Sequence, residues 1–205
     1  MTAAVSTPEQ VDAAAARRIE AVVIGASAGG FSALLAVLGG LPASYPMPIA
    51  AVLHLPDNHD SRLAELFGYR LALRVREARD KESLAPGVLY FAPSGYHLSI
   101  ENDRSFSFSC EDRVCFARPA IDVLFSSASD AYRDRLAAVL LTGANFDGAA
   151  GLAGMRLAGG LAIVQDPATA EVRTMPEAAI RRMTPDLILP LTEINSLLHR
   201  LGAPK

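Results

Sequence analysis

The sequence predicts an α/β fold of three layers (α/β/α), in which helices cover both faces of a mostly parallel β-sheet and one β-hairpin is inserted in the middle. Apolar runs of strand length recur along the chain, and segments with helical spacing separate most of them. These runs are apolar without alternation, which is typical of strands buried on both faces of a parallel sheet. The chain of 205 residues, 51% of them hydrophobic, is long enough for one such domain.

The first half of the chain alternates predicted strands with helices and then forms the hairpin. Residues 21–25 are apolar and mostly β-branched, which favours a strand. They run into a glycine-rich turn and a helix over residues 31–38, which Gly39 and Gly40 terminate. The elements predicted next are a strand at 48–53, a helix at 62–71 capped by Asp60 or Ser61, strands at 74–78 and 88–92, and a hairpin of 96–100 with 106–108.

The second half returns to alternating helices and strands. Apolar side chains at helical spacing predict a helix over residues 119–133. Residues 136–142 form the most apolar segment, which we expect at the centre of the sheet. The remaining predicted elements are a helix at 149–158, a strand at 161–164, a helix at 175–183, a strand at 187–189 and a helix at 192–201 capped by Thr192.

The first residues differ in composition from the rest of the chain. Residues 1–18 are rich in Ala, Ser and Thr, and their apolar residues are mostly alanine. We therefore expect a flexible or loosely docked arm there, with a weak helix within residues 9–20. Residues 19–205 then make up the single folded domain, because no internal repeat or second domain is visible.

Charge and composition exclude several classes of protein. The formal net charge of −3 does not favour nucleic acid or an anionic membrane as a partner. No apolar run reaches the roughly 18 residues that span a bilayer, and the N-terminus lacks the pattern of a secretory signal. The two cysteines, Cys110 and Cys115, are too few for a disulfide scaffold, so we expect a cytoplasmic protein with free thiols.

Three residues with complementary chemistry follow predicted strands. Ser27 comes after the first strand, His54 after the second, and Asp147 lies in the loop after the most apolar one. Ligands of an open parallel sheet bind at the carboxyl ends of its strands. A serine nucleophile, a histidine base and a carboxylate that orients the histidine form a complete set for acyl transfer. The small residues around Ser27 suit a hydroxyl exposed on a sharp turn.

An acyl-transfer site also needs donors for the oxyanion and groups that hold the substrate. Backbone N–H groups at the start of the first helix point to the right place, and the loop before Asp147 offers a second set. A histidine in the hairpin and an arginine at the start of the helix over 119–133 are expected near the substrate. The residues predicted on this rim are Ala28, Gly29, Ala144, Asn145, His97 and Arg118.

Each member of the triad also has a simpler explanation. Ser27 and Asp147 are of the residue types that cap helices, and His54 is of a type that packs at strand ends. Three such coincidences do not usually supply a nucleophile, a base and an orienting acid on one edge of a sheet. Their joint placement therefore favours the triad.

Two rival sites fit the sequence less well. His54, Asp57, His59 and Asp60 form a cluster of the kind that binds divalent metals, but no third histidine stands nearby, and we expect no metal. The glycine-rich turn matches a dinucleotide-binding motif only in part. Its middle glycine is replaced by serine, and a histidine stands where the acid that holds the ribose is expected. We therefore expect no organic cofactor.

Several separated motifs resemble one known family. They are Ile24-Gly-Ala-Ser27-Ala-Gly-Gly30, His54-Leu-Pro56, Phe91-Ala-Pro93 with His97, Arg118-Pro-Ala-Ile-Asp-Val-Leu-Phe125, Leu141-Thr-Gly143-Ala-Asn-Phe-Asp147-Gly-Ala-Ala-Gly151 and Met175-Pro176. Over nearly its whole length from Val22, the chain resembles the catalytic domain of CheB-type chemotaxis protein-glutamate methylesterases.

This resemblance implies a cytoplasmic serine hydrolase. Such an enzyme removes methyl groups from glutamate γ-methyl esters in the cytoplasmic helical region of chemoreceptors, releases methanol, and also deamidates certain receptor glutamines. Its triad maps onto Ser27, His54 and Asp147, the residues that the strand ends indicate, and it uses no metal or organic cofactor. Residues 19–205 would then be a methylesterase-like catalytic domain.

The chain departs from the family pattern at four positions. Where the family usually has Thr, Met, Gly and Arg, this sequence has Ala28, Ala144, Asn145 and Glu177. The family also usually carries an N-terminal receiver domain, for which the roughly 20 residues before the first strand are too few. We therefore expect no control by phosphorylation within this chain, and a separate regulatory protein in place of that domain.

Two other functions stay open at this point. One is a degenerate, non-catalytic domain that binds receptors or a signalling partner, which the four departures favour. The other is a serine hydrolase that acts on a different ester.

Overall fold

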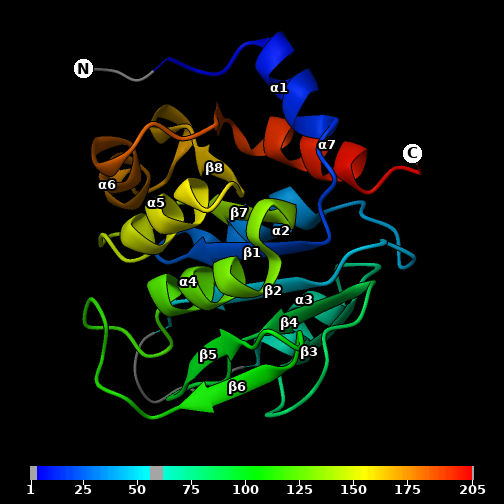
Figure 1. The fold of residues 1–205 in the computed structure, drawn as a ribbon, viewed down its shortest axis with the longest axis vertical. Helices are drawn as coiled ribbons and strands as arrows, with labels where there is room; N and C mark the ends of the chain where they lie inside the picture. The colour runs from blue at the N-terminus through cyan, green and yellow to red at the C-terminus, as the bar shows by residue number, and fades with distance from the viewer. Residues whose placement is uncertain (1–3, 56–61, 205) are drawn as a thin grey trace.

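The computed structural model describes residues 4–55 and 62–204 and has the predicted α/β architecture. Seven parallel strands form one sheet in the order β3-β4-β2-β1-β7-β8-β9 (Figure 1). Their bounds are β1 Ala21–Ala26, β2 Ile49–Leu53, β3 Arg74–Glu77, β4 Val88–Phe91, β7 Leu136–Leu140, β8 Leu161–Gln165 and β9 Leu187–Leu189. The inserted hairpin forms a separate antiparallel pair of β5 His97–Ile100 and β6 Phe106–Ser109.

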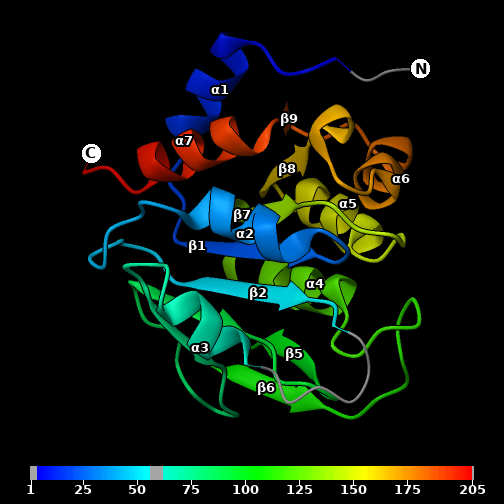
Figure 2. The same cartoon turned by 180° about the vertical axis from the view of Figure 1, so that it is seen from behind.

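Helices cover both faces of the sheet, as the continuous apolar strands predict. Four helices lie on the face in front in Figure 2, namely α1 Pro8–Ala15, α2 Gly30–Leu38, α3 Leu63–Gly68 and α7 Leu191–Leu201. The opposite face carries α4 Ile121–Tyr132, α5 Ala149–Leu157, α6 Thr174–Arg182 and the hairpin. Successive strand residues alternate between the two cores, so that Val22 and Ile24 pack on one side and Ala21 and Val23 on the other.

The caps predicted for two helices, α3 and α7, are not found among the described residues. The caps proposed for α3, Asp60 and Ser61, lie outside the described residues. Thr192 does not cap α7, because the helix already begins at Leu191. The carbonyl of Pro190 accepts hydrogen bonds from the backbone N–H groups of Glu193 and Ile194, both at 3.0 Å, and so sets the start of the helix.

The segment for which we expected a flexible or loosely docked arm contains helix α1, which packs against α7. Ala14 is buried at this contact. The backbone N–H of Ser6 donates to the carbonyl of Ile188 in β9 at 3.0 Å. Arg200 Nη2 lies 2.7 Å from Asp12 Oδ1. These polar partners come from the far end of the chain, so an alanine-rich composition could not reveal them.

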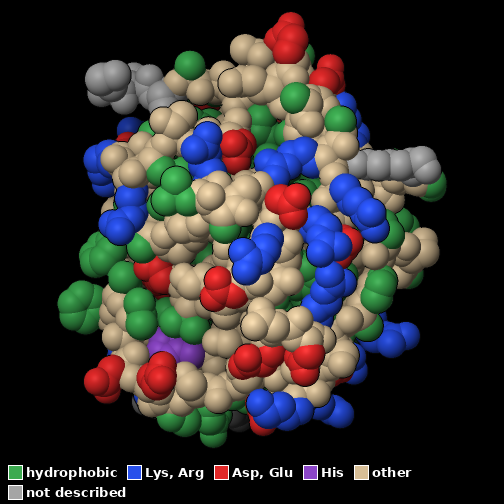
Figure 3. Space-filling model, in the orientation of Figure 1, with side chains coloured by type: hydrophobic (Ala, Val, Ile, Leu, Met, Phe, Trp, Pro, Cys, Tyr) green, Lys and Arg blue, Asp and Glu red, His purple; other side chains and the backbone are tan. Residues whose placement is uncertain are grey.

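The surface has no single dominant charge on the face shown in Figure 3, where acidic and basic side chains are interspersed. None of the helices in the described ranges 4–55 and 62–204 is long and apolar enough to cross a membrane.

Gly25 of β1 is predicted to tolerate no side chain. A Cβ atom there would overlap Ile121 at the start of α4, and both residues are buried. We expect Gly25→Ala to lower the free energy of unfolding by about 1–3 kcal/mol, measured by urea denaturation. Gly154→Ala is the control, because Gly154 is exposed on α5 with open space around it, and alanine there should stabilise the helix slightly. Equal stability of wild type and Gly25→Ala would contradict this packing.

Candidate active site

The sheet order brings the three predicted triad residues to one edge. β1 pairs with β2 on one side and with β7 on the other, and the strands are parallel, so their carboxyl ends lie together. Ser27 and His54 directly follow β1 and β2, and Asp147 lies in the loop between β7 and α5. Backbone hydrogen bonds continue past the strand ends, from His54 N to Ala26 O and from Ser27 N to Thr142 O, each at 3.0 Å.

A cavity of about 290 Å³ opens at this edge. Ser27, His54, Arg118 and Asn145 are among the residues that line it, together with the loop over residues 113–117. The predicted nucleophile Ser27, the predicted base His54 and two of the predicted rim residues therefore line one cavity.

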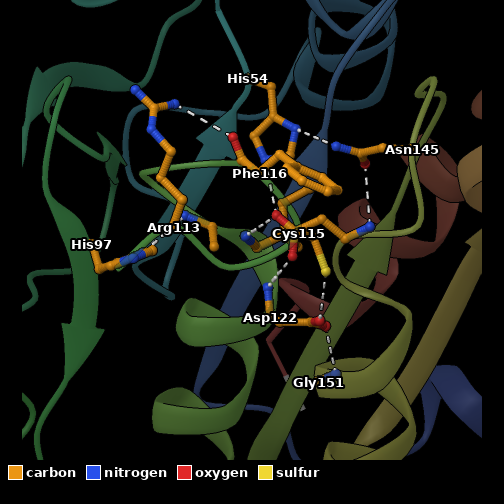
Figure 4. A network of polar contacts seen from close by, with 11 residues as sticks. His54, His97, Arg113, Cys115, Phe116, Asp122, Asn145 and Gly151 are labelled. Atoms are coloured by element: carbon orange, nitrogen blue, oxygen red, sulfur yellow. Dashed lines mark hydrogen bonds and ion pairs between the residues drawn. The ribbon is translucent and has the colours of Figure 1, made fainter. Parts of the chain in front are cut away.

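The histidine is oriented by a buried carboxylate. His54 Nε2 lies 2.9 Å from Asp147 Oδ2 (Figure 4). The Asp147 side chain has no exposed surface, and that of His54 is 12% exposed. Since a carboxylate only accepts hydrogen bonds, His54 Nε2 carries the proton in the neutral ring, and Nδ1 carries the lone pair.

The N-terminus of α4 holds this carboxylate. Ile121 N donates to Asp147 Oδ2 at 2.7 Å, and Asp122 N donates to Oδ1 at 3.0 Å. These N–H groups have no partner within the helix, and the helix dipole favours a negative charge at this end. The buried charge of Asp147 thus has three N–H partners, two from the backbone and one from His54.

Asp122, near the start of α4, binds the start of the next helix, α5, in the same way. Its Oδ1 accepts a hydrogen bond from Gly151 N, in the first turn of α5, at 2.7 Å. Asp147 therefore caps α4 while Asp122, a residue of α4, caps α5. Burial raises the pKa of the Asp122 carboxyl, the bond from Gly151 opposes this, and the neighbouring charge of Asp147 adds to it.

Ser27 sits on a sharp turn between β1 and α2. Its carbonyl accepts a hydrogen bond from Gly30 N at 2.7 Å, and Gly29 adopts φ +75°, which suits glycine. A side chain at Gly29 would also meet Glu171. Within the described part of the chain, the Ser27 hydroxyl makes no hydrogen bond, so it faces the cavity unpaired.

Of the residues predicted to supply backbone N–H groups for an oxyanion, Asn145 lines the cavity, whereas Ala28, Gly29 and Ala144 are not among its lining residues. Among residues 4–55 and 62–204, the N–H groups of Ala28, Gly29, Ala144 and Asn145 have no hydrogen-bond partner. Gly143 N is not available, because it donates to Val172 O at 3.1 Å. The backbone N–H groups of Ala28, Gly29, Ala144 and Asn145 therefore stay candidates for the oxyanion site.

His97 does not lie on the rim, which corrects the prediction. It is the first residue of β5, is 1% exposed and contacts the start of α4. Its Nε2 lies 3.0 Å from Asp112 O and its Nδ1 accepts from Ala120 N at 3.2 Å, so it joins the hairpin region to the start of α4. Arg118 does line the cavity, but its Nη1 donates to the carbonyls of Cys110 and Glu111 and thereby also holds this loop.

Thr142, which the sequence analysis did not propose as a site residue, connects the turns around the site. Its hydroxyl lies 2.9 Å from Ala28 O and accepts a hydrogen bond from Val172 N at 2.9 Å. Its backbone N donates to Gln165 Oε1 at 2.9 Å. The available signal was a polar residue at the end of the most apolar strand, where a buried hydroxyl needs partners.

The His/Asp cluster that was weighed as a rival metal site includes Asp57, His59 and Asp60, which lie outside the described residues. A different group, Cys115 with Asp122 and Asp147, has its potential ligand atoms within 4.8 Å of one another. Both carboxylates already accept backbone N–H groups, so this group fits a hydrogen-bonded network better than a metal site.

Comparison with known proteins decides the family. A family model described as CheB methylesterase matches residues 22–198. The chain belongs to the CheB methylesterase family. The resemblance that the separated motifs predicted is confirmed.

Individual CheB relatives agree in sequence and fold. A Leptospira interrogans protein, named as a candidate protein-glutamate methylesterase/protein-glutamine glutaminase, is 46% identical over 89% of this chain and 94% of its own length. Protein-glutamate methylesterase/protein-glutamine glutaminase 2 of Anaeromyxobacter dehalogenans is 44% identical over 94% of this chain, which spans 57% of that protein. The crystal structure of the Thermotoga maritima CheB methylesterase catalytic domain matches with a TM-score of 0.83 and 34% identity, over 88% of this chain and 98% of that one.

Thr142→Val tests the anchoring hydroxyl of this CheB-family site. The substitution keeps the shape of the side chain but leaves Val172 N and Ala28 O without their partner. We expect the free energy of unfolding to fall by about 1–3 kcal/mol in urea denaturation. Thr142→Ser keeps the hydroxyl and should cost less. The role assigned to the hydroxyl is contradicted if the valine variant is as stable as the serine variant.

Cys115 is predicted to react slowly with alkylating reagents. Burial, followed by the charges of Asp147 and Asp122, raises the pKa of its thiol to about 11. Only the thiolate reacts, so we expect the rate with iodoacetamide to rise about tenfold per pH unit between pH 8 and 10. Mass spectrometry of Cys110→Ser isolates this thiol. A rate that is the same at pH 8 and pH 10 would contradict the raised pKa.

Proposed function

We propose that this chain is a serine hydrolase that demethylates glutamate γ-methyl esters of chemoreceptors and also deamidates receptor glutamines. The observation that carries the proposal is the buried Asp147 carboxylate on His54 Nε2, beside the cavity that Ser27 lines. The names of the CheB relatives supply the substrate class. The cytoplasm, where the receptor helices carry these esters, is the proposed place of action.

The first half of the reaction forms an acyl-enzyme. His54 Nδ1 takes the proton of the Ser27 hydroxyl while Oγ bonds to the ester carbonyl carbon, and Asp147 stabilises the resulting imidazolium through Nε2–H. The free N–H groups of Ala28 and Gly29, or those across the cavity, stabilise the oxyanion. When the carbon–methoxy bond breaks, His54 returns its proton to the methoxy oxygen, and methanol leaves.

Water completes the reaction. His54 Nδ1 removes a proton from water as its oxygen bonds to the acyl carbon, and the bond to Ser27 Oγ then breaks. The proton on His54 returns to Ser27, and the product is a glutamate side chain. A glutamine substrate follows the same steps with ammonia as the leaving group. None of these steps requires a metal or an organic cofactor.

The border of the cavity suits an acidic helical segment of a receptor. Arg113 and Arg118 line it, and guanidinium groups bind carboxylates. Leu55 and Phe116 also line it and are exposed, at 40% and 87%. Glu177, which departs from the family pattern, lies 3.4 Å from Arg181 on the same helix, so its charge is partly compensated.

Methanol release from a methylated chemoreceptor tests the proposal. We expect Ser27→Ala to lower the rate by on the order of 10³-fold or more, because it removes the nucleophile. Ser126→Ala is the control, since Ser126 is exposed on α4 away from the cavity lining. Equal rates for wild type and Ser27→Ala would overturn the mechanism.

The same assay separates the two other functions. Receptor binding without methanol release by the wild type would favour a non-catalytic binding domain. Hydrolysis of small esters without action on the receptor would favour a hydrolase for a different ester.

A further inference from the structure

The side chain of Asn145 contacts the base nitrogen of His54. Asn145 Nδ2 lies 3.4 Å from His54 Nδ1 (Figure 4), whereas Asp147 contacts the other ring nitrogen, Nε2. Asn145 Oδ1 accepts a hydrogen bond from the backbone N of Asp147 at 3.2 Å. One amide therefore touches both the base and the residue that orients the base.

The hydrogen-bond network determines which end of the amide faces the ring. The backbone N–H of Asp147 can only donate, so the oxygen of Asn145 must point to it. The nitrogen then faces His54 Nδ1. Since Nε2 carries the ring proton, Nδ1 is an acceptor, and the amide nitrogen is a suitable donor to it.

This contact occupies the lone pair that must receive the serine proton. Ser27, His54 and Asn145 line the same cavity, and the Ser27 hydroxyl makes no hydrogen bond within the described ranges of the chain. His54 is thus held from both sides, with a carboxylate at one nitrogen and an amide at the other.

We propose that Asn145 is a positioning residue for His54. Asp147 sets the tautomer with a proton on Nε2, and the Asn145 amide donates to the remaining lone pair on Nδ1 and so keeps it directed into the cavity. The Ser27 hydroxyl displaces or shares this contact during the reaction. The catalytic consequence rests on the proposed function, whereas the tautomer of His54 does not.

Two substitutions separate this role from that of a simple loop stabiliser. Asn145→Asp keeps an oxygen for the N–H of Asp147 and so preserves the turn, but it offers no donor to Nδ1 and instead demands a proton there. Asn145→Ala removes both contacts. A loop stabiliser predicts that the aspartate variant resembles wild type, whereas a donor to Nδ1 predicts that it is the worse of the two.

The tautomer is measured by ¹⁵N NMR of the histidine rings at pH 8, where a free imidazole is neutral. His54→Gln assigns the His54 signals. His97 serves as an internal reference, because its Nδ1 accepts the backbone N–H of Ala120 rather than a contact from Asn145. We expect His54 Nδ1 to be unprotonated in wild type and in Asn145→Ala, where Asp147 still accepts the Nε2 proton, and protonated in Asn145→Asp. Unchanged His97 signals would show that each variant is folded. A wild-type tautomer of His54 in Asn145→Asp would overturn the proposal.

Methanol release supplies the catalytic readout. We expect kcat to fall about tenfold in Asn145→Ala, the effect of one hydrogen bond, and on the order of 100-fold in Asn145→Asp, which loses the free base nitrogen, with KM little changed in both. Wild-type kcat in Asn145→Asp would overturn the positioning role. If the wild type itself releases no methanol, the proposed function fails, and the NMR result still decides the role of Asn145.

Discussion

The buried negative charge of Asp147 is the constraint on which the rest of the site depends. A carboxylate without exposed surface is costly unless hydrogen bonds replace the water it has lost. Here the replacements come from the first two residues of α4 and from His54. Satisfying that charge fixes the start of a helix, the path of the loop after β7 and the orientation of the histidine at once.

The topology of the sheet explains why these groups meet. From β1 the chain proceeds to β2 on one side, builds the strands beyond it and the hairpin, and only then returns to β7 on the other side of β1. Ligands of open α/β sheets bind where the direction of winding reverses in this way. Ser27 follows the strand at which the reversal occurs, so the proposed nucleophile stands between the two halves of the sheet.

The elements of the fold were largely predictable because their signals are local. Buried strands such as β1 and β7 are recognisable in the sequence as apolar runs. Ser27 and His54 directly follow two such runs, and Asp147 lies in the loop after a third. The contacts of the site were not predictable in the same way. His97 lies in a hairpin whose alternating pattern is typical of a half-exposed strand, yet contact with α4 buries it. Thr142 and Asn145 act through partners that lie far away in the sequence, such as Ala28 and His54. The docking of α1 likewise depends on Ile188 and Arg200, which no pattern near the N-terminus indicates.

The exchange of aspartates between α4 and α5 has a consequence for how the protein acquires its chemistry. Asp147 completes the end of a helix that begins 26 residues earlier, and Asp122 completes one that begins after Asp147. Neither helix end is satisfied while the two segments are apart, even if each is already helical. The orienting carboxylate therefore reaches its place only when the helices dock, and a partly folded chain with native secondary structure has no ordered base. The ordered histidine is thus a product of tertiary assembly rather than a property of any one segment.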